Sequence, residues 1–391
     1  PQYMTSRLYY RIESHPHTDS YEETVEKTSY LLEDSIRMQM VSDVPISTLL
    51  SGGVDSSYVS AVCNHFLPED TPLTTYSFDY TDNAVYFQAN SFQPSEDRPY
   101  VDIMKDYLHS DHIYLTCSYT QLADLLEASV DSRCLPTMAD VDSSLLYFCG
   151  EVAKHHKVTL TGDEIFGGYP WFHRDAMLQS NTFPWTMDIS FRKSLLHPEF
   201  AASMQMEKYI AKAYRTTLSE VDTLPEESPL DTKKRQIAYL NIRWFMQTLL
   251  DRMDRTSMQH GLEARVPFAD YRVVDYVFNV PWSIKAKDGV PKSLLRACAA
   301  KYLPDTIMNR PKSPYPKTYH PEYERVLANR LREVVTDTAS PLRSYLNIPA
   351  VLKFLDEPKE YGKPWFGQLM AGPQMIAYLL QVDYWMRKYM L

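Results

Sequence analysis

One segment constrains the fold more than any other: a short β-type run that ends in a pair of glycines and opens directly into a helix. Residues 46–60 read ISTLLSGGVDSSYVS. The apolar, β-branched run predicts a buried strand, and the residues after the glycine pair predict a helix. Glycine is scarce, with 11 in 391 residues, and five of the eleven lie in this turn and in a second group at 162–168. Both groups therefore mark turns in which the backbone adopts conformations that other residues disfavour or approaches a neighbouring group or ligand closely.

Strand and helix patterns alternate through the first half of the chain. The expected strands are 46–50, 73–79, 112–116 and 158–161, and the expected helices are 20–40, 55–66, 97–109 and 142–156. Such alternation predicts an α/β fold with a doubly wound parallel sheet. From about residue 235 onward, amphipathic helices rich in Met, Leu and aromatic residues follow, and no strand is expected there. The C-terminal part is thus predicted to be a mainly helical layer.

Charge and hydropathy exclude several classes of protein. Forty Lys and Arg against fifty Asp and Glu give a formal net charge of −10, which argues against a broad surface for nucleic acid or anionic lipid. No run of 18 apolar residues is present, and the first residues lack the pattern of a signal peptide. We therefore expect no membrane span, no nucleic-acid partner and a cytoplasmic location.

The glycine pair after the first strand has the chemistry of an anion site. Gly52 and Gly53 let successive N–H groups approach an anion, and Ser51 and Ser56 add hydroxyl donors. The helix that follows points its positive end at the same place. Asp55 fits such a site if a Mg²⁺ ion bridges its carboxylate to phosphate oxygens. The segment matches neither GxxxxGK[ST] nor GxGxxG, and a plain strand-to-helix turn capped by Ser and Asp is the structural alternative.

Four segments, in this order, resemble one family over nearly the whole chain. They are SGGVDSS at 51–57, TGDEIFGGYPWFH at 161–173, GLEARVPFAD at 261–270 and NRPKSPYPKTYHP at 309–321. Together they resemble the synthetase domain of glutamine-dependent asparagine synthetases of the bacterial type, within the ATP-pyrophosphatase (PP-loop) superfamily. The resemblance runs from about Tyr21 to the PWFGQLMAGPQ segment at 364–374.

The resemblance implies an ATP-dependent ligase. Members of that family activate the side-chain carboxylate of aspartate by attack on the α-phosphorus of ATP, which gives β-aspartyl-AMP and pyrophosphate; ammonia then displaces AMP. ATP, Mg²⁺, aspartate and ammonia are therefore the expected ligands, and a homodimer is compatible with the resemblance. Two alternatives stay open: a relative that adenylates another carboxylate, as in β-lactam-forming or peptide-cyclising synthetases, and a catalytically degenerate nucleotide-binding protein.

The resemblance also assigns nucleotide-binding residues. The segment from Ser51 to Ser56 is expected to hold pyrophosphate, and Leu50, Phe78 and Gly162 are expected to hold adenosine. In full, the implied nucleotide-binding residues are Leu50, Ser51, Gly52, Gly53, Asp55, Ser56, Phe78, Thr161 and Gly162. Asp55 and Asp163 follow two different expected strands at one sheet edge, so both are expected to reach a single Mg²⁺ ion. A loop carboxylate or a helix cap is the structural alternative for Asp163.

Lys312, Asp163 and Arg252 are the catalytic residues that the resemblance implies. Lys312 belongs to a proline-rich loop and is expected to neutralise charge that grows on the α-phosphate. Lys317 competes with it from the same loop, and a solvated surface lysine is the alternative for either residue. The sequence DRMDR resembles a family stretch that faces the nucleotide, and Arg252 and Asp254 are the residues expected to do so; a helix-surface ion pair is the alternative.

Two departures from the family pattern concern the site and the domain organisation. The loop at Gly162 is three residues shorter than in the family and lacks a Glu that the family places in its active site, through either a deletion or residues omitted from the sequence as given. A glutaminase domain is not part of the chain as given, so free ammonia is the expected nitrogen source. Residues 1–18 are then expected to be a connecting segment, 19–230 the α/β ATP-binding part, and 231–391 the helical part of the same synthetase domain.

Overall fold

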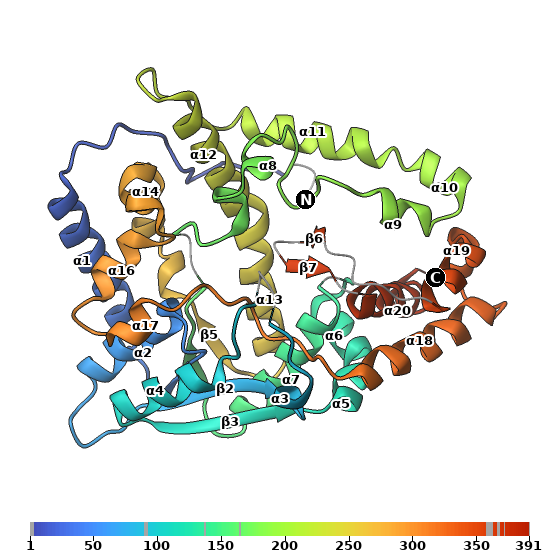
Figure 1. Ribbon diagram of the computed structural model, residues 1–391, viewed down its shortest axis with the longest axis horizontal. Coiled ribbons are helices and arrows are strands. Elements are labelled where there is room, and N and C mark those ends of the chain that lie inside the picture. The colour runs from blue at the N-terminus through green and yellow to red at the C-terminus, as the bar shows by residue number, and fades with distance from the viewer. Residues whose placement is uncertain are drawn as a thin grey trace.

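Five parallel strands form one sheet (Figure 1). The computed structural model describes residues 4–89, 93–136, 138–163, 166–356, 363–365, 368–370 and 372–390. The sheet has the order β3-β2-β1-β4-β5, and its strands are β1 (Ile46–Leu49), β2 (Thr74–Tyr80), β3 (Asp111–Cys117), β4 (Val158–Leu160) and β5 (Glu263–Arg265). Every neighbouring pair of these strands is parallel. The expected α/β fold with a doubly wound parallel sheet is therefore confirmed.

The chain winds outward from β1 in both directions. Strand β2 pairs with one side of β1 and strand β4 with the other. Helices α2 (Val54–Phe66), α4 (Arg98–Leu108) and α7 (Asp140–Ala153) lie in the connections between the first four strands. The winding direction reverses between β1 and β4, and open α/β sheets bind ligands beyond the carboxyl ends of the strands at such a point.

All eight elements expected in the first half are present within a few residues of their expected bounds. Helix α1 (Tyr21–Gln39) begins where a capping box fixes it: Ser20 Oγ accepts from Glu23 N at 3.2 Å, and the Glu23 carboxylate accepts from Ser20 N at 2.8 Å. The other helices described up to residue 228 are α3 (Asn83–Tyr86), α5 (Tyr119–Asp124), α6 (Leu126–Arg133), η1 (Pro170–Phe172), α8 (Asp175–Leu178), α9 (Ser190–Ser194), α10 (Pro198–Ser203) and α11 (Met206–Leu218).

The second half is mainly helical, as expected. Its helices are α12 (Pro229–Leu240), η2 (Asn241–Met246), α13 (Gln247–Met258), η3 (Pro267–Ala269), α14 (Tyr271–Asn279), α15 (Trp282–Lys285), η4 (Lys287–Gly289), α16 (Ser293–Ala299), α17 (Asp305–Met308), α18 (Pro321–Thr336), η5 (Leu342–Tyr345), α19 (Ile348–Asp356) and α20 (Gly372–Tyr389). The expectation that no strand follows residue 235 is wrong. Strand β5 extends the parallel sheet, and β6 (Lys363–Trp365) pairs antiparallel with β7 (Gln368–Met370). Strands of three residues are too short to show a period in the sequence.

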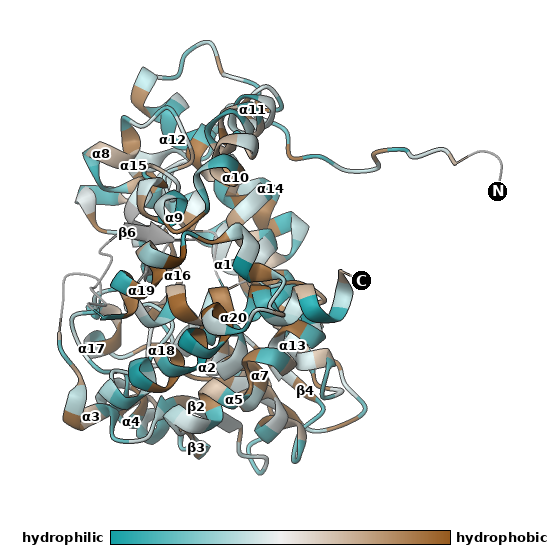
Figure 2. Ribbon diagram, turned by 90° about the vertical axis from the view of Figure 1, so that its right-hand side faces the viewer, coloured by the Kyte–Doolittle hydropathy of each residue, from teal (hydrophilic) through white to brown (hydrophobic). Residues whose placement is uncertain are grey.

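Helices cover both faces of the sheet and bury its apolar side chains. On one face α1, α2, α4, α14 and α16 form a core with Leu50 and Leu160. On the other face α7 and α13 pack against Tyr76 of β2. Figure 2 shows hydrophobic and hydrophilic residues mixed along these helices, as expected for helices between a core and solvent. In the described part of the chain, no helix has both the length and the apolar character needed to cross a membrane.

We predict that Phe148→Ala lowers the free energy of unfolding by about 3–5 kcal/mol. The Phe148 ring is fully buried on α7 and stacks on Phe78 of β2 with a centroid distance of 4.2 Å, so its removal leaves a cavity beneath the sheet. Phe66→Ala is the control, because that ring is 41% exposed. Urea denaturation followed by tryptophan fluorescence measures both variants. Equal losses of stability would contradict this packing.

Candidate active site

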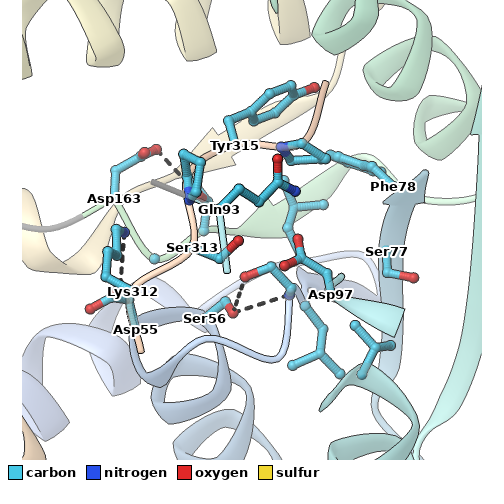
Figure 3. A pocket seen from close by; sticks show the side chains of 18 of the residues that line it. Asp55, Ser56, Ser77, Phe78, Gln93, Asp97, Asp163, Lys312, Ser313 and Tyr315 are labelled. Atoms are coloured by element: carbon cyan, nitrogen blue, oxygen red, sulfur yellow. Dashed lines mark hydrogen bonds and ion pairs between the residues drawn. The ribbon is translucent and has the colours of Figure 1, made fainter. Parts of the chain in front are cut away.

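One pocket collects most of the residues that the sequence singled out. It opens beyond the carboxyl ends of β1, β2 and β4, and α4, α13 and the loop at 309–320 complete its wall. Ten of the predicted site residues line it: Leu50, Ser51, Asp55, Ser56, Phe78, Thr161, Gly162, Asp163, Arg252 and Lys312. Figure 3 shows Asp55, Lys312 and Asp163 at one end of this pocket and Ser77 and Phe78 at the other. We call the first end the charged end and the second the Phe78 end, although further charged residues, Asp79, Asp97 and Arg98, also line the pocket.

The turn after β1 offers hydrogen-bond donors to an anion. Ser51 Oγ and Ser56 Oγ share a hydrogen bond of 2.9 Å, and Ser51 N donates to Ser56 Oγ at 3.1 Å (Figure 3). Gly53 is the N-cap of α2 and makes no side-chain cap hydrogen bond. Gly53 N also donates to Ser51 Oγ at 3.4 Å, so the two serines bond within the turn and the alternative of a serine-capped turn stays open. Backbone N–H groups at a helix N-terminus are suited to bind phosphate.

Two glycines hold this turn in place through close contacts. Gly52 has a φ of +69°, and a Cβ atom there would lie 2.6 Å from Tyr100 Cβ. A Cβ atom on Gly162 would lie 2.7 Å from Ser56 N, so the end of β4 packs directly on the backbone of α2. Among the described residues, Gly52 and Gly53 do not belong to the pocket lining. They shape the turn and leave contact with a ligand to their neighbours.

Asp55 is buried against two lysines from the second half of the chain. Lys292 Nζ donates to Asp55 Oδ1 at 2.8 Å and to Oδ2 at 2.6 Å, and Lys312 Nζ donates to Oδ2 at 3.4 Å (Figure 3). Burial alone would raise the pKa of Asp55, but the two ammonium groups outweigh it and lower that pKa below its usual value. Asp55 is therefore ionised. Sequence analysis missed Lys292, which no motif or spacing connects to Asp55.

Asp163 lies on the same side of the pocket with the opposite shift. Thr161 Oγ1 donates to Asp163 Oδ2 at 3.3 Å. Burial raises the pKa of Asp163, while the cations of Arg252 and Lys312 oppose the rise and the Asp55 carboxylate adds to it. The segment that follows Asp163 includes Glu164 and Ile165, which lie outside the described residues.

The donor set fits a metal ion that is held partly by its ligand. Within the described residues no group of three or more His, Cys, Asp or Glu is placed to hold an ion. Two carboxylates, Asp55 and Asp163, face one pocket. Mg²⁺ in nucleotide enzymes usually takes one or two carboxylates and completes its shell with phosphates and water. The pair is therefore sufficient for Mg²⁺ that arrives with a phosphate ligand.

Arg252 is a buried cation on the wall formed by α13. It is 3% exposed, its guanidinium lies 5.2 Å from the Tyr315 ring centroid, and its Nε has no hydrogen-bond partner within the described structure. Phe245 and Leu249 line the pocket from the same helical face, at i, i+4 and i+7 spacing. Asp254, two residues further along the helix, is exposed and is not among the described residues of the pocket lining.

The loop at 309–320 separates the two candidate lysines. Lys312 lines the pocket, and its Nζ lies 5.8 Å from the Tyr169 ring centroid. Lys317 Nζ lies near the Tyr319 ring, at 5.0 Å, and is not among the described residues of the lining. The same loop contributes Tyr315, whose hydroxyl is 3.2 Å from Ser144 Oγ. Geometry therefore favours Lys312 over Lys317.

The Phe78 ring gives its end of the pocket an apolar surface. One face of that ring is covered by Phe148, with the ring planes 2° apart, so this face is closed to a ligand. Gln93 is 3% exposed and lines the same region, where its Oε1 accepts from Tyr319 OH at 2.7 Å. Sequence analysis missed Gln93, because it lies in no motif. Leu50 and Thr161, the residues directly after β1 and β4, also line the pocket.

Known proteins share sequence with nearly the whole chain. The profile of the family described as asparagine synthase matches residues 27–387. Asparagine synthetase (glutamine-hydrolyzing) 3 of Bacillus subtilis (strain 168) is 45% identical over 387 residues, which cover 97% of this chain and 63% of that protein. Asparagine synthetase (glutamine-hydrolyzing) 1 of the same organism is 26% identical, with coverage of 90% and 59%. Amidase chry2 of Gibberella zeae is 23% identical, with coverage of 85% and 60%. The chain spans less than two thirds of each of these relatives.

We predict that Gly162→Ala weakens the binding of inorganic pyrophosphate at least about tenfold. The added Cβ would meet Ser56 N at 2.7 Å, so the turn that offers its N–H groups has to shift. Gly261→Ala is the matched control. The φ of +65° at Gly261 strains any other residue, but a Cβ atom added there would meet no atom within 4 Å, and Gly261 lies outside the described lining. Isothermal titration calorimetry measures both. Unchanged binding in Gly162→Ala would show that the turn does not hold phosphate.

Proposed function

The chain belongs to the asparagine synthase family, and on that premise we propose that its pocket converts aspartate to asparagine at the expense of ATP. The observation that carries the proposal is the charged end of the pocket. Asp55, Asp163, Lys292 and Lys312 gather there beside the N-terminus of α2. Two carboxylates and two ammonium groups in one place match a polyanion that arrives with its metal ion.

In the first half-reaction the side-chain carboxylate of aspartate is adenylated. A carboxylate oxygen forms a bond to the α-phosphorus of ATP, the bond from that phosphorus to the bridging oxygen breaks, and pyrophosphate leaves with the electron pair. The N–H groups that begin α2 and the hydroxyls of Ser51 and Ser56 bind the departing pyrophosphate. Lys312, which lines the pocket beside Asp55, neutralises charge that develops on the α-phosphate.

Asp55 and Asp163 are the residues that would hold Mg²⁺ in this site. When bound, the ion supplies positive charge to the phosphate oxygens. The ionised state of Asp55 supports this role, because its pKa is lowered by the lysines around it. Asp163, whose pKa is raised mainly by burial, gains most from a nearby cation.

The adenosine part of ATP occupies the other end of the pocket. The resemblance implies Leu50, Phe78 and Gly162 for adenosine, and all three line the pocket. Phe78 lies at the end away from Asp55 and Asp163 (Figure 3), whereas Gly162 packs on Ser56 beside the phosphate site. The separation of the charged end from Phe78 in Figure 3 supports a nucleotide that lies across the sheet edge, with its phosphates at β1 and its base at β2.

In the second half-reaction ammonia attacks the acyl-adenylate. Its nitrogen forms a bond to the carbonyl carbon, the bond from that carbon to the AMP oxygen breaks, and one proton is released. Arg252 binds an anionic group of the substrate, since its guanidinium is buried and keeps one N–H without a partner in the described structure. Free ammonia serves the chain as given.

The parts 19–230 and 231–391 act as one synthetase unit. Lys292 and Lys312 from the second part pair with Asp55 from the first, and β5 of the second part pairs with β4 of the first. The buried contacts between the parts support this organisation. Residues 1–18 are the connecting segment in this proposal.

We predict that the purified chain releases pyrophosphate from ATP with Mg²⁺, aspartate and ammonium, and that Lys312→Ala lowers kcat about 10²- to 10³-fold. The loss follows from the position of Lys312 beside the phosphate site. Lys317→Ala is the matched control from the same loop and keeps a kcat close to that of the unaltered chain. A coupled pyrophosphate assay and chromatographic detection of asparagine provide the two readouts.

Parallel reactions with glutamine, without nitrogen donor and with other carboxylates define the substrate. Pyrophosphate matched by asparagine with ammonium supports the proposal. Release that requires a carboxylate other than aspartate would replace aspartate as the substrate, as in the relatives that form β-lactams or cyclise peptides. Nucleotide binding without any release of pyrophosphate would contradict catalysis and favour a degenerate binding protein.

A further inference from the structure

Arg310 is a buried arginine to which the proposed function gives no role. It stands two residues before Lys312, directly after the turn that follows α17, and is 3% exposed. Burial of a guanidinium is costly unless charged and polar partners surround it. The contacts of Arg310 therefore show what its position requires.

The guanidinium of Arg310 joins its own loop to two other segments, the turn after β1 and the start of α4. Its Nη1 donates to the Ser51 carbonyl oxygen at 2.8 Å, in the turn after β1. Its Nη2 donates to Asp97 Oδ1 at 2.5 Å, at the N-terminus of α4. Its planar group lies over the Tyr100 ring, 4.1 Å from the centroid. Two hydrogen bonds to different acceptors and one ring contact fix both the position and the orientation of the Arg310 guanidinium.

The same contacts also reach Gly52 in the turn after β1, residues 51–53, which we call the phosphate turn. Tyr100, on which Arg310 stacks, is the residue that a Cβ atom on Gly52 would strike at 2.6 Å. Arg310 and Tyr100 therefore support the turn at both Ser51 and Gly52. The buried side chain of Arg310 thus attaches the start of the loop at 309–320 to the phosphate turn.

The backbone around Arg310 is fixed from a further helix. Arg296 of α16 donates to the carbonyl oxygens of Met308 and Arg310, the second at 2.9 Å, and its Nε donates to the Pro291 carbonyl oxygen at 3.1 Å. Pro291 immediately precedes Lys292. The backbones that carry both lysines of the site are therefore held by arginines, while the lysines themselves contact Asp55.

Lys312 depends on this support more than Lys292 does. The side chain of Lys312 is 36% exposed and that of Lys292 is 3% exposed. A lysine side chain has four flexible methylene groups and loses substantial rotamer entropy when it is held in one place. The position of Lys312 Nζ therefore depends on how firmly the backbone at the start of its loop is held.

We propose that Arg310 is a positioning residue that attaches the Lys312 loop to the phosphate turn and so places Lys312 Nζ at the charged end of the pocket. Asp97, which lines the pocket, is its counter-ion. The pairing also keeps the Asp97 charge compensated where an anionic ligand binds. The link to catalysis rests on the proposed function, whereas the position of Lys312 does not.

The first experiment measures the position of Lys312 without any ligand. The amine of Lys312 is acetylated under limiting sulfo-N-hydroxysuccinimide acetate, and peptide mass spectrometry gives its rate. Arg310→Lys keeps a positive charge but loses the planar fork, and we expect Lys312 to react about five- to tenfold faster because its loop is released from the turn. Asp97→Asn, which removes the counter-ion and keeps the shape, is expected to raise the rate less.

Arg235→Lys is the matched control. Arg235 is 7% exposed and donates to Glu227 Oε1 at 2.7 Å and to Asn279 Oδ1 at 2.9 Å, outside the described lining of the pocket. Its replacement removes an equally buried arginine, so Lys312 is expected to react at the unaltered rate. Equal rates in Arg310→Lys and Arg235→Lys, or an unaltered rate in both Arg310→Lys and Asp97→Asn, would overturn the proposal.

A double-mutant cycle shows whether Arg310 acts through Lys312. Arg310→Lys is expected to weaken binding of inorganic pyrophosphate about tenfold in the unaltered chain and less than about twofold in Lys312→Ala. Equal weakening in both backgrounds would contradict action through Lys312. Both experiments omit aspartate, so a chain that fails to make asparagine but shows the labelling pattern refutes the proposed function and leaves the role of Arg310 standing. If pyrophosphate does not bind, the labelling rates alone decide.

Discussion

A buried carboxylate held by two lysines is the interaction on which the rest of the site depends. Asp55 stands in the first turn of α2, and Lys292 and Lys312 come from 237 and 257 residues further along the chain. A buried charge without partners would be strongly unfavourable, so the helical second half has to close over the sheet edge for Asp55 to be ionised. The charged end of the pocket is therefore built from both halves of the chain.

The remaining geometry follows from close packing at the carboxyl edge of the sheet. Gly162 brings β4 against the backbone of α2, and Gly52 brings the phosphate turn against Tyr100. Gly53, the N-cap of α2, makes no side-chain cap hydrogen bond at the start of that helix. Asp163 and Asp55 differ in pKa: burial raises that of Asp163, whereas the ammonium groups of Lys292 and Lys312 lower that of Asp55. One edge of the sheet thus provides hydrogen-bond donors for an anion, cations and carboxylates.

Local patterns in the sequence predicted most of this edge. Strand β1, the glycine turn and α2 follow from periodicity and turn chemistry over fifteen residues. Strand β5 was not predicted, because a strand of three residues shows no periodicity. The roles of Lys292 and Arg310 were not predicted, because their partners are far away in sequence. Residues two apart on a helix do not share a face: Arg252 lines the pocket, whereas Asp254 is exposed and is not among the described lining residues. Long-range charge pairing is what the sequence alone does not show.

Transfer of oxygen from the carboxylate to AMP tests the central claim most directly. Aspartate carrying ¹⁸O in its side-chain carboxylate is incubated with the chain, ATP, Mg²⁺ and ammonium, and the AMP is analysed by mass spectrometry. If the carboxylate attacks the α-phosphorus, each AMP formed gains one ¹⁸O atom for each asparagine. Asparagine formed with unlabelled AMP, or with ADP as the nucleotide product, would contradict adenylation in this pocket.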